Sequence, residues 1–471
     1  MSNLDVIIIG AGTAGLTARR EAAKVTDKYI VIEGGPMGTT CARVGCMPSK
    51  VLIQVANDFH QYKKLQNINV VEKSELKIDR VEVMKHVRSL RDRFVKGVTS
   101  STSSWSDKLV RGYAKFINEN TVEVNGEQYK ANKIIIATGS RPSVPQAWEK
   151  FKDYILDTND FFEQEKLDDN VLVVGLGVIG LELGQALSRL GVNVIAASSN
   201  KSIAGLSDPE IQDYTYEKLE NEFKIYLERA ELIEITDDNK IKVKLGDKYI
   251  SVDKVLLSMG RKPNIDKLDI EKTGVSLNDK GLPKVDFNTM CIEGAEHLFL
   301  PGDVNTDRPI LHEAADEGKI SGFNAVNEEK CFKRRVPLGI TFSDPNIAKV
   351  GKSYSELKSE NTNFITGKVT FEGQGRSIVK LKEQGLLHVY MQEETGLILG
   401  AELQAPAGEH LAHLLAWAIS MKLTVFEALK MPFYHPVIEE GLRTALRDGA
   451  KQVKGSEDYN ELFRCDDSPI R

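Results

Sequence analysis

Residues 5–15 read DVIIIGAGTAG, an apolar run followed by three glycines, and a helix-forming stretch comes next. The apolar run predicts a buried strand, and the glycine spacing predicts a sharp turn into a helix. The glycines permit the turn, a close approach of the backbone to a pyrophosphate, and packing of the helix on the strand. The pyrophosphate would lie at the helix N-terminus, where free N–H groups and the helix dipole favour an anion. These glycines are Gly10, Gly12 and Gly15.

The next apolar run supports a nucleotide at this turn. It reads YIVIE and ends at Glu33, about where a carboxylate would accept hydrogen bonds from a ribose. The glycine spacing alone is weak evidence, because a plain structural turn can share it. Together with the acid, the spacing predicts a bound adenine dinucleotide.

The same pattern returns in residues 171–180, which read VLVVGLGVIG. The strand expected after it reads VNVIAASSN, and it has Ala196 and Ala197 where the acid should fall. An NAD preference therefore has no support from this strand. Residues 198–201 can be interpreted either as a site for a 2′-phosphate or as a solvated polar loop. The glycines of this second pattern are Gly175, Gly177 and Gly180.

Two mirrored segments mark the borders of an inserted domain. IIIATGSRP (134–142) and VLLSMGRKP (255–263) each close an apolar strand with a glycine, an arginine and a proline. About 120 residues lie between them, a size that suits an inserted dinucleotide domain. From about residue 336, alternating strand patterns and one helical pattern predict a separate α+β unit.

The predicted fold class is α/β, with two Rossmann-like dinucleotide-binding domains and a C-terminal α+β domain. A chain of 471 residues is long enough for two to four domains. The first dinucleotide domain is expected at 1–142 and again at 266–335, the second at 143–265, and the C-terminal domain at 336–471.

Composition and charge narrow the class of protein further. A net charge of −6 and the lack of a long Lys/Arg run argue against a nucleic-acid partner. No apolar run approaches the roughly 18 residues that span a bilayer, and the N-terminus has the pattern of a strand rather than of a signal peptide. Five cysteines are too few for a secreted disulfide scaffold, so we expect a cytoplasmic protein. In a reducing cytoplasm a close cysteine pair is more often catalytic, redox-sensing or metal-binding than structural.

Cys41 and Cys46 form such a pair in the segment CARVGCMPSK. On an ideal helix a spacing of five residues turns the second side chain by about 140° and moves it by roughly 7.5 Å. A disulfide needs Cα atoms within about 7 Å, so the pair can bridge only across a distorted helix start. Gly45 and Pro48 favour such a distortion. Two unrelated buried thiols and half of a zinc site remain alternatives, although the sequence offers the zinc site no second Cys/His pair.

The motifs form an ordered set over nearly the whole chain. The set comprises GxGxxG with Glu33, CxxxxC before MPSK, ATG, a second GxGxxG, GRKPN, a Gly-Asp turn and a late His-Pro-x-x-x-Glu. With this set the sequence resembles the class I pyridine nucleotide-disulfide oxidoreductases, and the dihydrolipoamide dehydrogenase pattern is the most similar. The resemblance implies an FAD domain interrupted by an NAD(P) domain, with NAD slightly preferred over NADP. It also implies a C-terminal dimerisation domain and a homodimer that shares its active site between subunits, and it leaves a multienzyme complex open.

The resemblance also implies roles for residues around the cysteine pair. Cys41 would exchange with the substrate disulfide, and Cys46 would be the thiolate that contacts the flavin. Lys50 resembles a lysine beside the flavin, and Glu182 resembles its carboxylate partner beside the nicotinamide. Alternatively, Lys50 is a surface charge and Glu182 is an acid that the helix dipole stabilises. The implied cofactor-binding residues are Gly10, Gly12, Gly15, Glu33, Lys50, Thr138, Gly139, Gly175, Gly177, Gly180, Gly260 and Asp303.

The late motif implies a catalytic histidine. His435 and Glu440 match the family spacing, in which the histidine reaches the partner subunit's disulfide as general acid/base and the glutamate orients it. Glu439, the neighbouring acid, remains an alternative partner for His435. For His60, His86 and His388 we expect structural roles, since a lone histidine is more often structural.

Three departures from the lipoamide pattern leave the substrate open. Ala42 and Arg43 stand where the lipoamide enzymes usually have Leu-Asn, and Tyr434 precedes the late His-Pro motif. Arg43 would lower a thiol pKa, admit an anionic disulfide or face solvent. The predicted function is NAD(P)-linked oxidation of a small dithiol such as dihydrolipoamide. The alternatives are a glutathione-like or mercuric-like reductase, a flavin oxidase or transhydrogenase, and a non-catalytic redox-dependent binding protein.

Overall fold

The first apolar run forms β1 (Asn3–Ile9), at the centre of an eight-stranded sheet in a computed structural model that describes residues 3–72, 76–454 and 459–465. β1 pairs in parallel with β2 (Tyr29–Glu33) and with β6 (Glu127–Ile136). Parallel sheets are covered on both faces, so their strands carry apolar side chains without alternation. Successive residues Ile7 and Ile8 point to opposite faces and are both fully buried.

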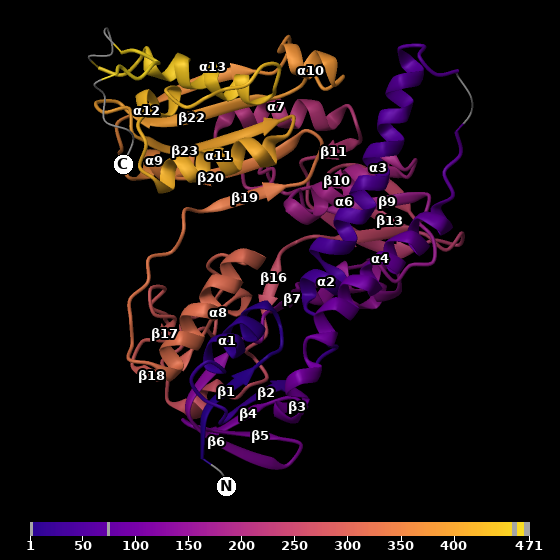
Figure 1. Ribbon diagram of the computed structural model, residues 1–471. Helices are drawn as coiled ribbons and strands as arrows, with labels where there is room; N and C mark the ends of the chain where they lie inside the picture. The colour runs from indigo at the N-terminus through magenta and orange to yellow at the C-terminus, as the bar shows by residue number, and fades with distance from the viewer. Residues whose placement is uncertain (1–2, 73–75, 455–458, 466–471) are drawn as a thin grey trace.

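Two distant stretches of the chain build this sheet, and together they form what we call the N-terminal unit (Figure 1). The strand order is β17-β18-β6-β1-β2-β3, and β5 pairs with both β6 and β4. α1 (Thr13–Ala22) packs on α8 (Leu311–Val326) so closely that a Cβ on Gly318 would lie 2.2 Å from the backbone oxygen of Ala14. The other strands are β3 (Leu109–Arg111), β4 (Lys115–Asn118), β5 (Thr121–Val124), β17 (Cys291–Ile292) and β18 (Ala295–Phe299).

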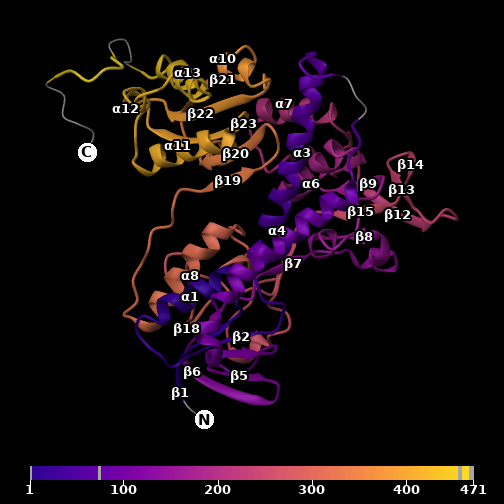
Figure 2. The ribbon, with the colours of Figure 1, turned by 45° about the vertical axis from the view of Figure 1, so that its right-hand side comes forward.

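The inserted unit holds a second sheet, in which all five strands are parallel. Its order is β11-β10-β9-β15-β8, and a separate antiparallel sheet of β12, β13 and β14 lies beside it (Figure 2). The strands are β8 (Ile155–Leu156), β9 (Asn170–Val174), β10 (Asn193–Ala197), β11 (Lys224–Tyr226), β12 (Ala230–Ile235), β13 (Ile241–Leu245), β14 (Lys248–Val252) and β15 (Lys254–Leu257). The helices are α5 (Thr158–Phe161), α6 (Val178–Arg189) and α7 (Pro209–Glu220).

The chain enters and leaves the inserted unit through a pair of short strands. β7 (Ser140–Pro142) and β16 (Arg261–Pro263) pair in antiparallel fashion, so the two crossings lie side by side. They are the two mirrored segments of the sequence. Short 3-10 helices cover Ser103–Lys108, Gln146–Tyr154, Ile270–Thr273 and Asp303–Asn305.

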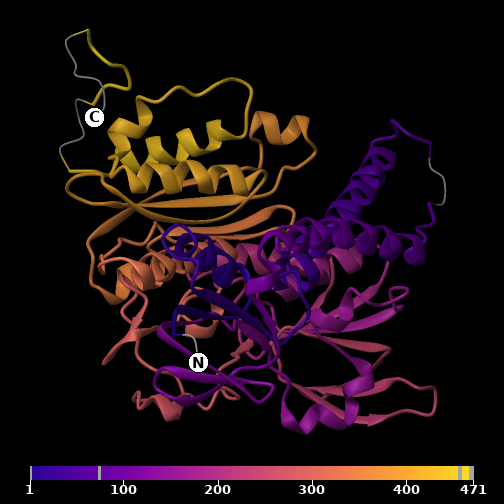
Figure 3. The same cartoon turned by 60° about the horizontal axis from the view of Figure 1, so that its bottom comes forward.

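The C-terminal unit is an antiparallel sheet with the order β19-β20-β23-β22-β21. Helices α11 and α13 cover one side of it (Figure 3). The strands are β19 (Leu338–Thr341), β20 (Asn346–Gly351), β21 (Phe364–Thr370), β22 (Leu386–Gln392) and β23 (Ile398–Ala405). The helices are α9 (Tyr354–Ser359), α10 (Gly375–Val379), α11 (Gly408–Ser420), α12 (Val425–Leu429) and α13 (Glu439–Ala450).

Three helices of the N-terminal unit carry the chain from β2 to β3 and touch the inserted unit. They are α2 (Thr40–Val44), α3 (Cys46–Asn67) and α4 (Arg80–Ser100). α3 packs against α6, and Leu52 and Ala56 of α3 share an apolar core with Leu183 and Leu187 of α6. The α/β class that the sequence predicts is confirmed by this arrangement of sheets and helices. Within the described ranges, the helices lack the combination of length and apolar character that a bilayer crossing needs.

Candidate active site

Cys41 and Cys46 lie on two different helices that meet at a break. α2 ends at Val44 and α3 begins at Cys46, while Gly45 between them has φ −127° and ψ −116°, outside the helical region. This is the distorted helix start that the five-residue spacing requires. Both cysteines are free thiols, and they lie close enough to shift each other's pKa values.

The two thiols have unequal acidity. The hydrogen bond from Cys41 and the positive charge of Lys50 outweigh burial and lower the pKa of Cys46 to about 7, from an ordinary 9.0. The same hydrogen bond, together with burial, raises the pKa of Cys41 above its ordinary value. Near neutral pH, Cys46 is therefore the thiolate and Cys41 keeps the proton.

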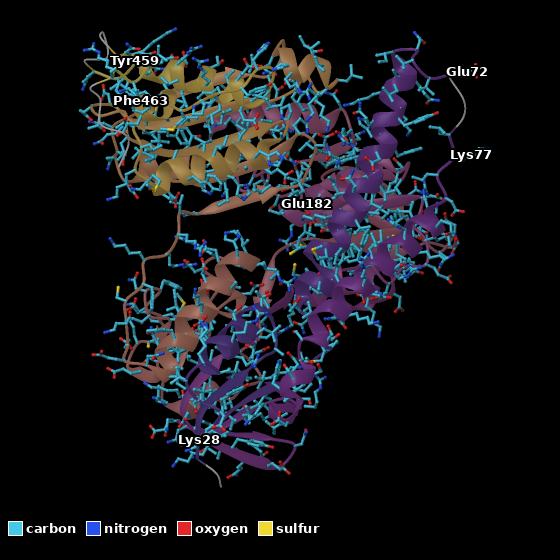
Figure 4. All side chains as sticks on the ribbon, viewed as in Figure 1. Lys28, Glu72, Lys77, Glu182, Tyr459 and Phe463 are labelled. Atoms are coloured by element: carbon cyan, nitrogen blue, oxygen red, sulfur yellow. The ribbon has the colours of Figure 1, made fainter. Side chains whose placement is uncertain are left out.

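A partly buried ion pair lines the same cavity as the thiols. Lys50 Nζ of α3 is 2.7 Å from Glu182 Oε2 of α6, and only 4% of the Glu182 side chain is exposed. The other carboxylate oxygen accepts the backbone N–H of Phe342 at 2.8 Å, and Lys50 Nζ lies 4.6 Å from the centroid of the Phe342 ring. All three units thus contribute to this pair, and Figure 4 shows Glu182 at the centre of the molecule, where they meet.

The cysteines and the ion pair open into one cavity of about 560 Å³. Residues of all three units line it, so one space borders both glycine-rich turns and the thiols. Cavities at the carboxyl ends of parallel strands are where open α/β sheets bind ligands. The lining includes Gly12, Cys41, Cys46, Lys50, Gly139, Val178, Glu182 and Asp303.

The first glycine-rich turn has the shape of a pyrophosphate cradle. Gly10 has φ +112°, which side chains rarely tolerate, and a Cβ on Gly15 would lie 1.8 Å from the Gly10 oxygen. A Cβ on Gly12 would meet no described atom within 4 Å, so this backbone is open to a ligand. α1 begins there without an acidic residue in its first turn, which leaves its N–H groups and dipole for an anion.

The second turn repeats this geometry. Gly175 has φ +101°, Gly177 is open, and a Cβ on Gly180 would lie 2.0 Å from the Gly175 oxygen. α6 likewise begins at this turn without an acid in its first turn. Both turns therefore fit a dinucleotide, as does Gly260 beside the second turn, which has φ +92° and no described neighbour to a Cβ within 4 Å.

Glu33 closes the first turn from the end of β2. Its Oε2 accepts the N–H of Ala11 at 2.8 Å, and its Oε1 accepts the N–H of Gly35 at 2.6 Å. Each carboxylate oxygen has two lone pairs, so each keeps one for a ribose hydroxyl. The position expected from the sequence therefore suits that role.

Two more of the expected cofactor residues line the same cavity as Gly12 of the first turn, namely Gly139 and Asp303. Thr138 directly precedes Gly139. The Thr138 hydroxyl oxygen is buried without a hydrogen-bond partner among the described residues, and a buried hydroxyl usually has one. A polar ligand would supply that partner. Asp303 Oδ2 accepts from Ser140 Oγ at 2.9 Å, and Arg261 Nε donates to Ser140 Oγ at 2.7 Å.

The strand register corrects one expectation about the second turn. Gly10 N–H donates to the Ile32 oxygen one residue before Glu33, and Gly175 N–H donates to the Ala197 oxygen. Ser198 therefore occupies the place of Glu33, whereas the sequence pattern put Ala196 and Ala197 there. Ser198 Oγ donates to the Asn200 oxygen at 2.8 Å, and Lys201 forms an ion pair with Asp213.

His435 forms a pair with Glu440 on the C-terminal unit. His435 Nδ1 lies 2.9 Å from Glu440 Oε1, and this hydrogen bond lowers the pKa of the Glu440 carboxyl below its ordinary value. Glu440, rather than Glu439, is thus the partner. The His435 side chain is 79% exposed, and neither residue is among the described residues that line the cavity. His435 is therefore not part of the described lining of the cavity that holds the cysteines of the same chain.

Arg43 and His388 have local surroundings that the sequence left open. Arg43 Cγ and Val95 Cγ1 both border Gly38, so Arg43 extends toward α4 and is not among the residues that line the cavity. Its Nε is buried without a hydrogen-bond partner among the described residues. His388 is buried, with Nδ1 2.7 Å from Asp208, which agrees with the structural role expected of it.

Sequence reasoning missed Ser140, Arg261 and Phe342. Ser140 and Arg261 follow the two mirrored glycines, and that repeated position was an available signal for them. Phe342 gave none, because its contact with Glu182 joins residues 160 apart in the sequence.

Comparisons with known proteins agree with this geometry. Residues 4–318 match the family described as pyridine nucleotide-disulphide oxidoreductase, and residues 338–446 match the dimerisation domain of that family. The chain belongs to the pyridine nucleotide-disulphide oxidoreductases. It is 30% identical to the dihydrolipoyl dehydrogenase of Thermus scotoductus over 96% of this chain and 99% of that one. The Bacillus subtilis enzyme of the same name is 26% identical over 93% and 94%.

Solved structures share the fold. LpdA from Mycobacterium tuberculosis superposes with a TM-score of 0.82 at 21% identity, covering 94% of this chain and 99% of that one. The flavoprotein disulfide reductase RclA from Escherichia coli, in its Cu(II) complex, gives 0.81 at 21% identity over 95% and 99%. This pyridine nucleotide-disulphide oxidoreductase is an FAD-dependent enzyme that transfers electrons between NAD(P)H and a disulfide. Its dimerisation domain supports a homodimer.

Proposed function

We propose that the enzyme oxidises a small dithiol, with dihydrolipoamide as the first candidate, through the Cys41/Cys46 pair. The observation that carries the proposal is the placement of the two thiols at a helix break, in one cavity with the Lys50–Glu182 pair and with residues of both glycine-rich turns. The relatives named dihydrolipoyl dehydrogenase support the choice of dithiol.

One substrate thiolate attacks Cys41 Sγ of the oxidised pair, the bond between the cysteines breaks, and Cys46 leaves as a thiolate. The second substrate thiolate then attacks the substrate sulfur that is bound to Cys41. The Cys41 sulfur leaves as a thiolate and takes up a proton. The substrate loses two electrons, and the pair gains them. The electrostatics of the pair favour this end state, a Cys41 thiol beside a Cys46 thiolate.

The other residues would bind and orient. FAD supplies a two-electron acceptor and NAD⁺ the final hydride acceptor when both are bound. The first turn, Glu33, Thr138, Gly139 and Asp303 would hold FAD, and the second turn and Gly260 would hold the nicotinamide dinucleotide. Lys50 would stabilise the Cys46 thiolate, and Glu182 would keep Lys50 in place.

We propose that His435 of a second copy exchanges the proton of Cys41, with Glu440 orienting it. An exposed His435–Glu440 pair outside the cavity of its own chain supports this proposal. So does α11, which presents Leu414, Trp417 and Met421 along one face, with Trp417 68% exposed. We further propose NAD(H), rather than NADP(H), as the preferred nicotinamide dinucleotide, and a cytoplasmic location. Membership of a multienzyme complex stays a prediction, as do the domain ranges 1–142, 143–265, 266–335 and 336–471.

The decisive experiment follows the visible spectrum of the purified flavoprotein during two-electron reduction. A thiolate next to an oxidised flavin should give a charge-transfer band, and Cys46→Ser should abolish it. Cys41→Ser should abolish dithiol turnover while sparing flavin reduction by NADH. Full turnover in Cys41→Ser would overturn the proposal in favour of a flavin oxidase or transhydrogenase. A panel of dihydrolipoamide, glutathione disulfide and Hg(II) would rank the substrates.

A further inference from the structure

Helices α3 and α6 are joined by two polar contacts at matched spacing. The first is the Lys50–Glu182 pair, and the second is a hydrogen bond of 2.7 Å from Arg189 Nη1 to Asn57 Oδ1. The two contacts lie seven residues apart on each helix, which is about two turns or roughly 10.5 Å. Both helices start at the cavity, at Cys46 and next to Gly177. The Lys50–Glu182 pair thus joins the helices near the cysteines, and the Arg189–Asn57 hydrogen bond joins them about two turns further from the cavity.

All five N–H donors of the Arg189 side chain form hydrogen bonds. Its side chain is 4% exposed, and a guanidinium has five N–H donors. Glu222 accepts two of them at 2.9 and 2.8 Å, and Asn57 accepts one. Asp344 accepts the other two, through Oδ2 at 3.0 Å and through its backbone oxygen at 2.8 Å. One side chain thus joins the N-terminal, inserted and C-terminal units.

The same face of α6 holds one short segment of the C-terminal unit. Gln185 Oε1 accepts the N–H of Asp344 at 2.8 Å, and Gln185 Nε2 donates to the Asp344 oxygen at 3.1 Å. Glu182 accepts the N–H of Phe342. Residues 182, 185 and 189 lie on one side of a helix, so they fix the segment that stacks Phe342 under Lys50.

A purely stabilising role explains this arrangement less well. Buried ion pairs often contribute little net stability against apolar groups of similar size, and α3 and α6 already share an apolar core. An apolar contact tolerates small slides and rotations of one helix on the other. Directional hydrogen bonds do not, and fixing a register is the better-attested use of buried polar groups.

We propose that Arg189 is a positioning residue for the redox centre. Its hydrogen bonds to Asn57 and Asp344 fix the register of α3 on α6, and they so hold the Lys50–Glu182 pair beside Cys46. Arg189 touches neither the thiols nor the cavity, and it acts through α3, α6 and Phe342. The inference rests on the proposed role of Lys50 toward the Cys46 thiolate.

The test measures the acidity of Cys46 directly. In the flavin-loaded Cys41→Ser protein, the rate of Cys46 alkylation by iodoacetamide is followed against pH by mass spectrometry. Adding Arg189→Ala should raise the midpoint by about one pH unit, because Lys50 moves away from the thiolate. Asn57→Ala removes the Arg189–Asn57 hydrogen bond from the side of α3, so it should shift the alkylation midpoint in the same direction. Arg189→Lys should restore part of the difference.

The matched control is Arg80→Ala. Arg80 also joins the N-terminal and inserted units, through Asp169 and the oxygens of Leu190 and Gly191 at the end of α6, but its bonds come from α4 and not from α3. Its midpoint should equal that of the parent. With Cys41 present, Arg189→Ala should lower kcat about tenfold and leave KM for the dithiol unchanged.

The outcomes separate this inference from the proposed function. Equal alkylation midpoints in Arg189→Ala, Asn57→Ala and the parent would overturn the inference, even if the melting temperature fell. If Arg189→Ala fails to fold, the Asn57→Ala midpoint decides alone. Absence of a charge-transfer band in the wild type would instead sink the proposed function, and the alkylation midpoints would still decide the role of Arg189.

Discussion

The chemistry at the residue scale depends on where a single proton lies. Cys41 and Cys46 are the same residue type five positions apart, yet the hydrogen bond between them and the charge of Lys50 give their pKa values opposite shifts. Exchange at Cys41 then requires a group that removes its proton, whereas Cys46 needs none near neutral pH. This asymmetry supports the proposed division between a Cys41 thiol that meets the substrate and a Cys46 thiolate that meets the flavin.

The first prediction concerns the pH dependence of the reduced pair. Because the pKa of Cys46 in the folded protein lies below the ordinary 9.0, its thiolate is present above pH of about 7 and is lost as the pH falls through that value. The charge-transfer absorbance of the two-electron-reduced protein should follow this titration. A midpoint close to 9 would contradict the assignment.

The second prediction concerns Lys50. Lys50→Met removes the cation that stabilises the Cys46 thiolate, so the midpoint of the same absorbance should rise by about one pH unit. Lys63→Met removes a lysine of the same helix whose ammonium stacks on Phe59, and its midpoint should not move. Equal midpoints for Lys50→Met and Lys63→Met would show that Lys50 does not act on the thiolate.

At the scale of elements, the two glycine-rich turns use their glycines in different ways. The third glycine of each turn is required by contact with the chain itself, while the second faces open space. We therefore expect the third glycine to be needed for folding and the second for binding of a dinucleotide. Substitutions can therefore separate the two requirements within one turn.

The third prediction compares Gly177→Ala with Gly180→Ala. A methyl on Gly180 would lie 2.0 Å from the Gly175 oxygen, so it should destabilise the protein by about 1–3 kcal/mol and lower its melting temperature. A methyl on Gly177 meets no described atom within 4 Å, so the melting temperature should stay constant while KM for NADH rises at least about tenfold. A loss of stability in Gly177→Ala equal to that in Gly180→Ala would refute this division.

The sequence predicts elements better than the contacts between them. The glycine spacing, the apolar runs and the cysteine spacing are local, so the parallel strands that carry the two glycine-rich turns and the helix break at Gly45 could be expected. The place of Ser198 could not, because the pairing of β10 with β9, rather than any local pattern, decides where β10 ends. Arg189 gave no signal either, since its partners lie 33, 132 and 155 residues away in the chain.

At the scale of the whole molecule, the groups that we propose as catalytic lie in different units of the chain. The thiols lie where the three units meet, and the His435–Glu440 pair lies exposed on the C-terminal unit outside that cavity. A family dimerisation domain covers residues 338–446, which include His435. A complete site would then need two copies, each supplying what the other lacks.

The fourth prediction tests this sharing by mixing two inactive proteins. Cys41→Ser and His435→Gln should each lose most dithiol turnover. After unfolding and refolding together in equal amounts, about half of the dimers are mixed and each mixed dimer has one intact site, so about a quarter of wild-type activity should return. No recovery, with mixed dimers confirmed by native mass spectrometry, would show that each chain uses its own His435.

The paired strands β7 and β16 have a consequence for how such an enzyme can be built. They bring the two ends of the inserted unit side by side, so the surrounding sheet can close whether or not anything is spliced in at that point. The inserted unit is therefore a domain whose two chain crossings lie at one fixed place. The corresponding domain of a relative that binds a different dinucleotide could be grafted at the same two crossings without altering the thiol chemistry. Its first long helix would have to present the partners that α3 and the segment at Phe342 require.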